Sequence, residues 1–390
     1  MVAPELLFYG GFPLGYHNRE AERKALAFAD AGYDVVYMSG IGVRDPRLRT
    51  LPKAGRIVAQ RVHHRQSAPS RGPGPGRPLR QAGLTVVPPR RLRPLRRFNE
   101  RWVERQLRGV LVAPDAAVAW IRGPTPELVE ALSRSPPAVI VYECVDALDH
   151  TPGLAGTAWL KVFQRAERRL AGLADVVVAT SPPLADRFRG LGAEVRLMAH
   201  GVDLFPWHPR QGRPAGPIVL GFVGSLDFRI DTPLLRTLAT SRPDWQIRLC
   251  GVVGPGFDPK PLVDLPNVTI GPRVEHERLG EVLGGFDLGL LPYLDTPVYR
   301  HMNPLKNLEL LAAGRAAVAR PAPALDAFAD VLYLARSPQE FIAQCDRALA
   351  EDSLARAHAR RAIAERHTWD DRLAELVALL GDLRTRRVAT

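Results

Sequence analysis

Short apolar runs, glycine-rich turns and segments with helical spacing alternate along the first half of the chain. The apolar run Leu6–Tyr9 is followed by a glycine loop, by a helical pattern over Arg19–Ala31 and by a second apolar run at 34–38. Strand, helix and strand in this order predict a βαβ unit and a parallel sheet. We expect further strands at 84–87, 116–120, 139–142 and 175–179, and helices at about 95–107 and 158–170.

The same alternation restarts after residues 206–217, which are rich in proline and glycine and are typical of an interdomain linker. The fold class expected is α/β, with two Rossmann-like doubly wound domains that face each other across a cleft. The predicted domains are 1–205 and 218–366, and a closing helix at 367–390 is expected to cross back to the first domain. Residues 63–83 lack apolar periodicity and repeat Pro-Gly, which predicts a mobile loop within the first domain.

Charge is distributed unevenly along this chain, whose formal net charge is +12. The stretch Arg61–Arg108 holds 13 arginines against two acids, Glu100 and Glu104. Such a stretch suits nucleic acid, anionic lipid headgroups or a phosphorylated acceptor, and a solvated arginine-rich face is the alternative. The three cysteines are isolated, so they predict neither a metal site nor disulfides. No long apolar run or secretory signal is present, and we expect a cytoplasmic protein.

The string 301–318, HMNPLKNLELLAAGRAAV, carries the most specific chemistry. Pro304 fits the start of a helix, and Lys306 and Glu309 lie three residues apart on one face of it. A helix start with a lysine favours a diphosphate, and a carboxylate one turn further in can accept from both ribose hydroxyls. The helix is expected to stop at Gly314, beside a strand end where open α/β sheets bind ligands. An ordinary surface ion pair is the alternative for Lys306 and Glu309.

The whole string resembles the donor-site signature of GT-B glycosyltransferases, in which Pro-x-Lys-x-x-Glu-x-x-Ala-x-Gly-x-x-x-Val recurs. The chain is similar to bacterial enzymes of the family 1 and family 4 type that make teichuronic acid and exopolysaccharides. The resemblance implies that Glu309 binds the ribose of a nucleoside-diphosphate sugar and Lys306 its phosphates. Many retaining members have an acid where His301 stands, so the resemblance leaves the sugar and the stereochemical outcome open.

The resemblance extends along nearly the whole chain. Phe222–Leu226 resembles the glycine-rich loop after the first strand of the nucleotide lobe, and Asp287–Tyr293 the strand before the donor motif. His200–Asp203 and Thr368-Trp369 resemble the end of the first lobe and the start of the closing helix. Arg229 and Asp231 are near enough in sequence to reach the diphosphate and the sugar, although each also has an ordinary loop explanation. The donor-binding candidates are Gly224, Ser225, Arg229, His301, Asn303, Pro304, Lys306, Asn307 and Glu309.

Acceptor chemistry is expected in the first domain. The segment Tyr142–His150 follows a strand and places three acids and a histidine in one predicted loop. Related bacterial transferases carry Tyr-Asp-x-Val-Asp-Asp here, which implies Asp146 and Asp149 as catalytic base or acceptor ligand. A solvated acidic turn or a helix cap is the alternative. The loop after the first strand adds His17 as a catalytic candidate, and the acceptor-binding candidates are Gly10, Gly11, Asn18 and His150.

The resemblance implies a glycosyltransferase of hexosyltransferase type, which transfers a sugar from a nucleoside diphosphate to a saccharide or lipid-linked acceptor. UDP is favoured on family frequency. The sugar nucleotide is a co-substrate, and no cofactor or metal is expected, because no Asp-x-Asp triplet is present. The segment Arg90–Arg108 is expected to contact an anionic membrane at its cytoplasmic face. A GT-B-shaped nucleotide-sugar epimerase is an alternative, whereas nucleic-acid binding is disfavoured because only Phe98 and Trp102 interleave the arginines.

Overall fold

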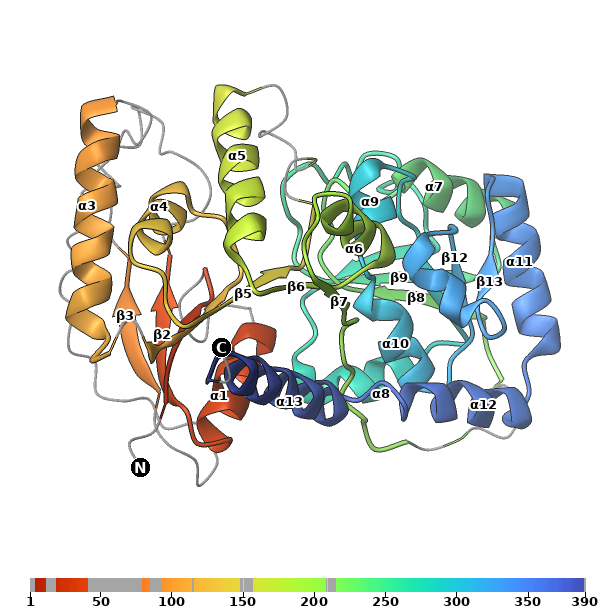
Figure 1. Cartoon of the computed structure of the whole chain (residues 1–390). Helices are drawn as coiled ribbons and strands as arrows, with labels where there is room; N and C mark the ends of the chain where they lie inside the picture. The colour runs from red at the N-terminus through yellow and green to blue at the C-terminus, as the bar shows by residue number, and fades with distance from the viewer. Residues whose placement is uncertain are drawn as a thin grey trace. The chain divides into compact units, whose positions relative to one another are not determined.

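The computed structural model of the protein describes residues 4–11, 19–40, 79–84, 93–113, 116–147, 150, 157–207, 209 and 215–388. The chain forms two compact units, the first made of 1–198 with 373–390 and the second of 199–372. Each unit is built on its own parallel sheet with helices packed against it (Figure 1). The predicted α/β class with two doubly wound sheets is therefore confirmed.

The first unit holds a seven-stranded sheet in the order β3-β2-β1-β4-β5-β6-β7, and every neighbouring pair is parallel. Apolar strand residues dominate this sheet because helices cover both of its faces. Its strands are β1 (Glu5–Tyr9), β2 (Asp34–Ser39), β3 (Arg80–Gly83), β4 (Val118–Ile121), β5 (Val139–Cys144), β6 (Val176–Ala179) and β7 (Val195–Leu197).

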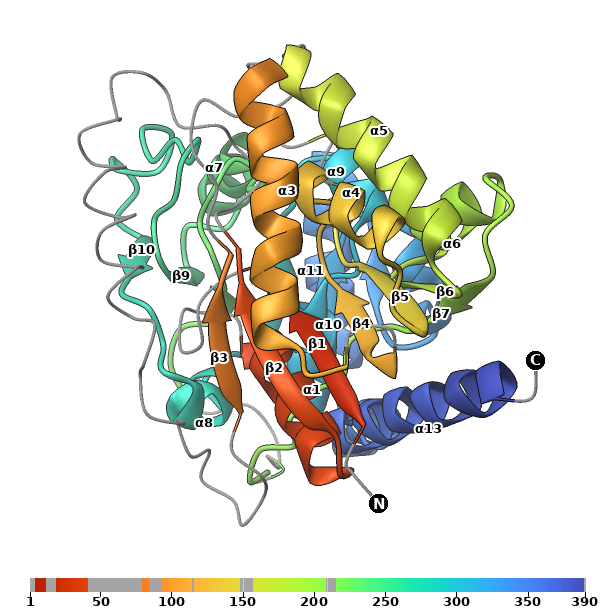
Figure 2. The ribbon, with the colours of Figure 1, turned by 60° about the vertical axis from the view of Figure 1, so that its left-hand side comes forward.

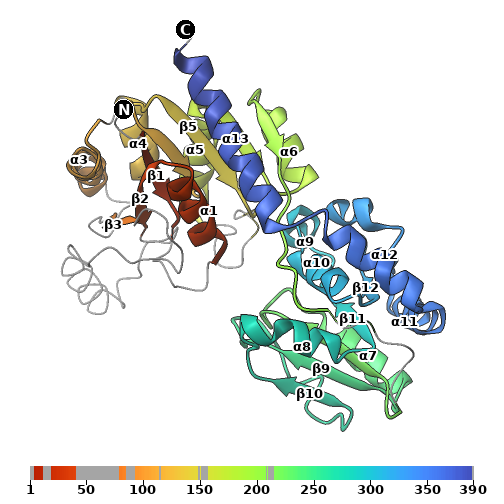
Figure 3. The same cartoon turned by 90° about the horizontal axis from the view of Figure 1, so that it is seen from below.

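Alternate residues of β1 belong to two separate hydrophobic cores, one on each face of the sheet. Leu6 and Phe8 pack with α1 (Arg19–Asp30) and with the part of α13 (Trp369–Val388) that belongs to this unit. Figure 3 shows these two helices on the same part of the sheet. Leu7 and Tyr9 pack on the opposite face, because successive side chains of a strand point to opposite sides. The helices of that face are α3 (Arg93–Val110), α4 (Pro126–Arg134), α5 (Ala158–Leu173) and α6 (Pro182–Arg189).

The strand β3 lies inside the segment predicted as a loop, so the prediction of a loop reaching residue 83 is wrong for Arg80–Gly83. The strand expected at 84–87 correspondingly starts too late, and 85–87 lie outside the described residues. Backbone pairing with β2 holds this polar strand at the sheet edge. Arg80 adds hydrogen bonds to Asp34 at 3.1 Å and to Glu5 at 2.7 Å. These tertiary contacts stabilise the strand, although its sequence lacks the apolar alternation that would predict one.

The second unit has a six-stranded parallel sheet in the order β10-β9-β8-β11-β12-β13. The order reverses between β8 and β11, which makes the carboxyl ends of these two strands the switch point where open α/β sheets bind ligands. The strands are β8 (Val219–Val223), β9 (Gln246–Cys250), β10 (Val268–Gly271), β11 (Leu288–Leu291), β12 (Ala317–Ala319) and β13 (Tyr333–Leu334). The helices are α7 (Thr232–Ser241), η5 (His276–Arg278), α8 (Leu279–Gly284), α9 (Pro297–His301), α10 (Leu305–Ala312), η6 (Pro323–Phe328), α11 (Pro338–Glu351) and α12 (Leu354–Ala364).

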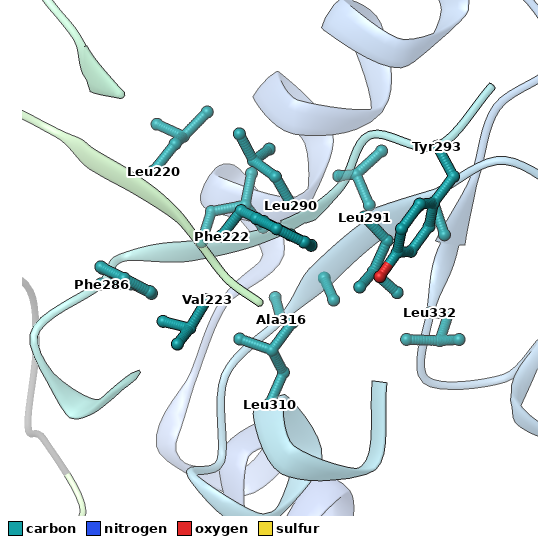
Figure 4. Packing of buried hydrophobic residues seen from close by; sticks show 14 of the residues in the cluster. Leu220, Phe222, Val223, Phe286, Leu290, Leu291, Tyr293, Leu310, Ala316 and Leu332 are labelled. Carbon is teal, nitrogen blue, oxygen red and sulfur yellow. The ribbon is translucent and has the colours of Figure 1, made fainter. Parts of the chain in front are cut away.

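The helix α10 is anchored in the core of this unit. Leu310 belongs to the buried hydrophobic core of this unit, which also includes Val223 and Ala316 (Figure 4). A Cβ atom on Gly289 would lie 2.4 Å from a methyl carbon of Leu310, so a glycine in β11 lets the helix approach the strand. Gly314, with φ of +68°, follows α10 and marks its end as the sequence predicts. The start of α10 is thereby fixed relative to the sheet.

The second unit begins at residue 199, before the linker expected at 206–217. Val202 pairs with Thr368, and a Cβ atom on Gly201 would lie 2.6 Å from the Cα atom of Trp369. These backbone contacts attach residues 199–205 to the second unit. In sequence, the same residues directly follow β7, the last strand of the first unit.

Candidate functional site

The first turn of α10 brings the two central candidates together. Pro304 occupies the N-cap, where its missing N–H removes no helical hydrogen bond. Lys306 and Glu309 follow on one face, and the Lys306 Nζ atom lies 2.8 Å from Glu309 Oε2. The Glu309 residue is 7% exposed, whereas 27% of the lysine side chain is accessible. The lysine therefore reaches outward over a carboxylate that the fold holds in place.

Two glycines bring the ends of β8 and β9 close to this turn. A Cβ atom on Gly224 would lie 3.2 Å from Lys306 Cε, so the backbone after β8 passes beside the lysine. A Cβ atom on Gly251 would lie 1.7 Å from the Gly224 carbonyl oxygen. Ser225 follows as an exposed residue. The switch point thus combines a glycine-lined backbone with a lysine and the amino end of a helix, which is the chemistry that binds phosphate groups.

Arg229, expected to reach a diphosphate, binds a neighbouring acid. Its Nε and Nη2 atoms donate to the two carboxylate oxygens of Asp227 at 2.9 and 2.7 Å. Burial raises the pKa of Tyr293, Arg229 lowers it, and Asp227 and Glu309 raise it further. These three charged groups therefore lie near enough to Tyr293 to act on its hydroxyl group. Asp227 and Tyr293 are neighbours of the candidates Arg229 and Glu309 that the sequence did not single out.

Asp231 has a role within the fold. One carboxylate oxygen accepts from the Leu234 backbone N–H at 2.9 Å, which caps α7, and the other accepts from Arg320 Nη2 at 2.7 Å. Arg320 directly follows β12, and its carbonyl oxygen accepts from the Tyr299 hydroxyl at 2.6 Å. Asp231 therefore ties α7 to the carboxyl end of β12.

The remaining donor candidates differ in their surroundings. His301 ends α9, and its Nδ1 atom lies 2.7 Å from the Pro297 carbonyl oxygen. Asn303 is 8% exposed. Asn307 is fully buried, and neither polar atom of its side chain has a hydrogen-bond partner in the structure. His301 therefore remains accessible next to the α10 start, whereas Asn307 faces the interior in this conformation.

The acceptor candidates belong to the first unit, at the carboxyl ends of its strands. Gly10 follows β1, and a Cβ atom there would lie 2.1 Å from the Tyr37 hydroxyl oxygen. Gly11 has φ of +79°, which favours glycine. Asp146 lies two residues after β5 and is exposed, as is His150. The other three candidates, His17, Asn18 and Asp149, lie outside the described residues.

Glu143 was assigned to the acidic loop before Asp146, and that assignment is wrong. Glu143 lies in β5 and is completely buried. Its carboxylate accepts from Lys24 Nζ at 2.7 Å and from Trp120 Nε1 at 2.6 Å, and Arg122 Nε lies 3.2 Å away. Glu20 pairs with the same two cations. Glu143 is therefore an interior ion-pair partner and is not placed to take a proton from an acceptor.

In the described part of the chain, no group of three or more His, Cys, Asp or Glu side chains is arranged to hold a metal ion. Among the same residues, no helix combines the length and apolar character needed to cross a bilayer.

Comparisons with known proteins concern the family and the fold of the chain. The model of a family described as glycosyl transferase-like matches residues 229–378, which include the α10 motif. The chain is 26% identical over 266 residues to TuaH of Bacillus subtilis (strain 168), a protein whose name assigns it to the glycosyltransferases of teichuronic acid biosynthesis. That alignment covers 62% of this chain and 66% of the relative, slightly less than two thirds of the relative's length.

Solved structures match both units. Sucrose-phosphate synthase from Thermosynechococcus elongatus superposes with a TM-score of 0.72 at 17% identity, over 99% of this chain and 100% of the other. Anabaena Alr3699/HepE in complex with UDP-glucose gives a TM-score of 0.62 at 15% identity, over 97% and 99%. These likenesses confirm the predicted GT-B fold.

Proposed function

We propose that this chain, which has the GT-B fold, is a glycosyltransferase that transfers a sugar from a UDP-sugar to a saccharide or lipid-linked acceptor. The observation that carries this proposal is the Lys306–Glu309 pair on the first turn of α10, next to Gly224. A buried carboxylate, an outward lysine and a glycine-lined strand end have the chemistry to bind a ribose and a diphosphate together.

In this proposal Glu309 accepts hydrogen bonds from the two ribose hydroxyls, which a carboxylate with two oxygens can do at once. Lys306 and the first-turn amides of α10 meet the diphosphate. The lysine ammonium has three protons, so it can keep its 2.8 Å contact with Glu309 while it donates to a phosphate oxygen. The same groups stabilise the charge that develops on the leaving nucleoside diphosphate.

Relatives support the choice of UDP and of a saccharide product. Alr3699/HepE was solved with UDP-glucose and with UDP and glucose, and the name of TuaH places that protein in teichuronic acid biosynthesis. We extend both features to this chain as proposals. Polysaccharide biosynthesis from a UDP-hexose is the activity that they favour.

On the acceptor side, Asp146 is the proposed base among the described residues. It is exposed and lies just beyond the carboxyl end of β5, where a sugar hydroxyl can approach it. Asp149 and His17 remain candidates by sequence. We further propose that transfer needs no metal, since a lysine and a helix start already meet the leaving group. Activity that is unchanged by EDTA would support this part, and activity restored only by a divalent cation would overturn it.

The proposal is tested by incubating the purified protein with UDP-hexoses and saccharide or lipid-linked acceptors, followed by product analysis. We expect UDP release that depends on the acceptor, together with a glycosylated product. A change in the donor sugar without any acceptor would identify the epimerase alternative. No turnover with UDP-, GDP- or ADP-sugars by a well-folded protein would contradict a transferase.

A contact with an anionic membrane through α3 is the second part of the proposal. Arg97, Arg101 and Arg105 are exposed and recur every fourth residue, so they share one side of the helix. Phe98 is 52% exposed and stacks on Trp102, with ring centroids 6.3 Å apart. Arginines beside an aromatic pair suit the headgroup region of a bilayer at the cytoplasmic face. Residues 90–92 of the predicted segment lie outside the described residues.

Vesicle co-sedimentation tests this contact. Binding should increase with the fraction of anionic lipid and decrease with salt, because surface charges are screened over about 10 Å at 0.1 M salt. Replacing the three arginines with glutamine should abolish it. Vesicle binding that does not change with lipid charge, with salt or with the three substitutions would refute the proposed contact.

A further inference from the structure

A cavity of about 600 Å³ lies in the first unit, between the sheet and the helices α3 and α4. These helices run side by side over one face of the sheet (Figure 2). The inner wall is apolar and is made partly of small residues. It includes Leu107 and Leu111 of the α3 region, Ala131 and Leu132 of α4, and Ala117 and Ala119 at β4. A hydrocarbon group suits a wall of this composition.

The mouth of the cavity holds two arginines beside one acid, Glu104. Arg108 of α3 and Arg134 of α4 line it, and their side chains are 64% and 39% exposed. Arg108 pairs with Glu104 at 2.7 Å and Arg134 with Glu100 at 3.0 Å. A guanidinium group carries five N–H donors, so each arginine can keep its carboxylate partner and still donate to a phosphate oxygen. Val112, which is 85% exposed, adds an apolar edge to the mouth.

The position of the cavity separates it from the sugar-transfer chemistry. Its lining includes the residues just before β4 and β5, namely Ala117, Pro136 and Pro137. These residues mark the amino edge of the sheet, whereas open α/β sheets bind their substrates at the carboxyl edge. A ligand in this cavity is therefore neither the sugar donor nor the attacking hydroxyl.

We infer that the cavity binds one hydrocarbon chain of an anionic membrane phospholipid, whose phosphate lies at Arg108 and Arg134. The inference rests on the proposed membrane contact of α3 and deepens it. The arginine and aromatic side of α3 brings the helix to a bilayer surface, and the C-terminal half of the same helix forms a wall of the cavity. A phospholipid supplies both an apolar chain for the interior and an anion for the mouth. Soluble phosphate has no group that fills the apolar part.

The test uses the full chain and a soluble phospholipid, dihexanoyl phosphatidylglycerol, held below its micelle concentration. This probe should raise the melting temperature of the wild type. Dihexanoyl phosphatidylcholine should do so much less, and glycerol phosphate should have no effect. Ala131→Leu, which fills the cavity, should remove the shift but keep the stabilisation by UDP. Ala355→Leu adds the same side chain at an exposed position of α12 and should keep both.

A second variant tests the mouth without changing the volume of the cavity. Arg108→Gln combined with Arg134→Gln should weaken binding of the phosphatidylglycerol about tenfold or more, the scale of a lost charge-assisted contact. A wild-type protein that is stabilised by UDP but not by the lipid would overturn the inference and leave the proposed transferase intact. An equal lipid shift in the wild type and in Ala131→Leu would overturn it as well, as would an equal shift by glycerol phosphate.

Discussion

Gly251 approaches Gly224 so closely that a Cβ atom on Gly251 would lie 1.7 Å from the Gly224 carbonyl oxygen. The Gly251 N–H donates to Gly271 at 3.2 Å, and the Gly224 N–H donates to Cys250 at 2.9 Å. The carboxyl ends of β8, β9 and β10 therefore lie close together, and Gly224 lies beside Lys306. The proposed diphosphate site depends on this approach, which only glycine permits.

Gly251→Ala is predicted to displace the Gly224 backbone and to weaken UDP binding about tenfold or more, since backbone donors to a phosphate are lost. Gly271→Ala in β10 is the matched control, because a Cβ atom there would meet Cys250 Sγ at an ordinary 3.5 Å. Calorimetric titration of both folded variants with UDP checks the prediction. Equal affinities in the two variants would show that the close approach has no part in binding.

The start of α10 could be predicted from sequence because its information is local. Pro304, Lys306, Glu309 and Gly314 lie within one short segment, and their spacing predicts a helix start, a shared face and a helix end. The strand β3 could not be predicted in this way. Its sequence, RQAG, has no apolar alternation, and pairing with β2 defines it.

His301→Ala is predicted to weaken binding of a UDP-sugar while leaving the affinity for UDP unchanged. The residue stands where related enzymes hold the donor sugar, and its Nδ1 atom is oriented by the Pro297 carbonyl oxygen at 2.7 Å. Arg300→Ala, at the exposed neighbour that pairs with Asp295, should change neither affinity. Titration with UDP and with the preferred UDP-sugar separates the two effects. A loss of the same size for both ligands would place His301 away from the sugar.

Glu143→Gln is predicted to destabilise the first unit by about 3–5 kcal/mol at neutral pH, because it breaks a buried ion-pair cluster. Burial raises the pKa of Glu143, but Arg122 and Lys24 lower it by more, so the pKa lies below its usual value. A carboxyl group whose pKa is lowered in the folded state stabilises the fold fully at pH values above its unfolded-state pKa, which is about 4.3. That contribution is lost as the pH falls through the folded-state pKa.

Urea unfolding of the wild type and Glu143→Gln at neutral and acid pH checks this prediction. The difference in unfolding free energy should shrink as the pH falls below about 4. Glu194→Gln alters an exposed acid of the same unit and should change stability by no more than about 0.5 kcal/mol. A difference that stays constant with pH would mean that the Glu143 charge does not stabilise the fold.

The role of Glu143 also shows what the sequence could not supply. Lys24 and Glu143 are 119 residues apart, and Trp120 and Arg122 come from another strand end. Nothing in the local pattern around Glu143 distinguishes this interior acid from the exposed Asp146 three residues later. Tyr293 is a second example, since Arg229 and Glu309 come near its hydroxyl group only in the folded second unit.

A thermal-shift titration of the wild type and Glu309→Ala with UDP, GDP and ADP tests the donor site most directly. UDP should stabilise the wild type, by about 2.7 kcal/mol at a concentration of 100 Kd, and this effect should disappear in Glu309→Ala. Glu281→Ala is the matched control, because Glu281 pairs with Arg278 at the same three-residue spacing but on an exposed surface, and it should retain the full shift. A wild type that no nucleotide stabilises, or a Glu309→Ala variant that UDP stabilises as much as the wild type, would contradict the proposed site.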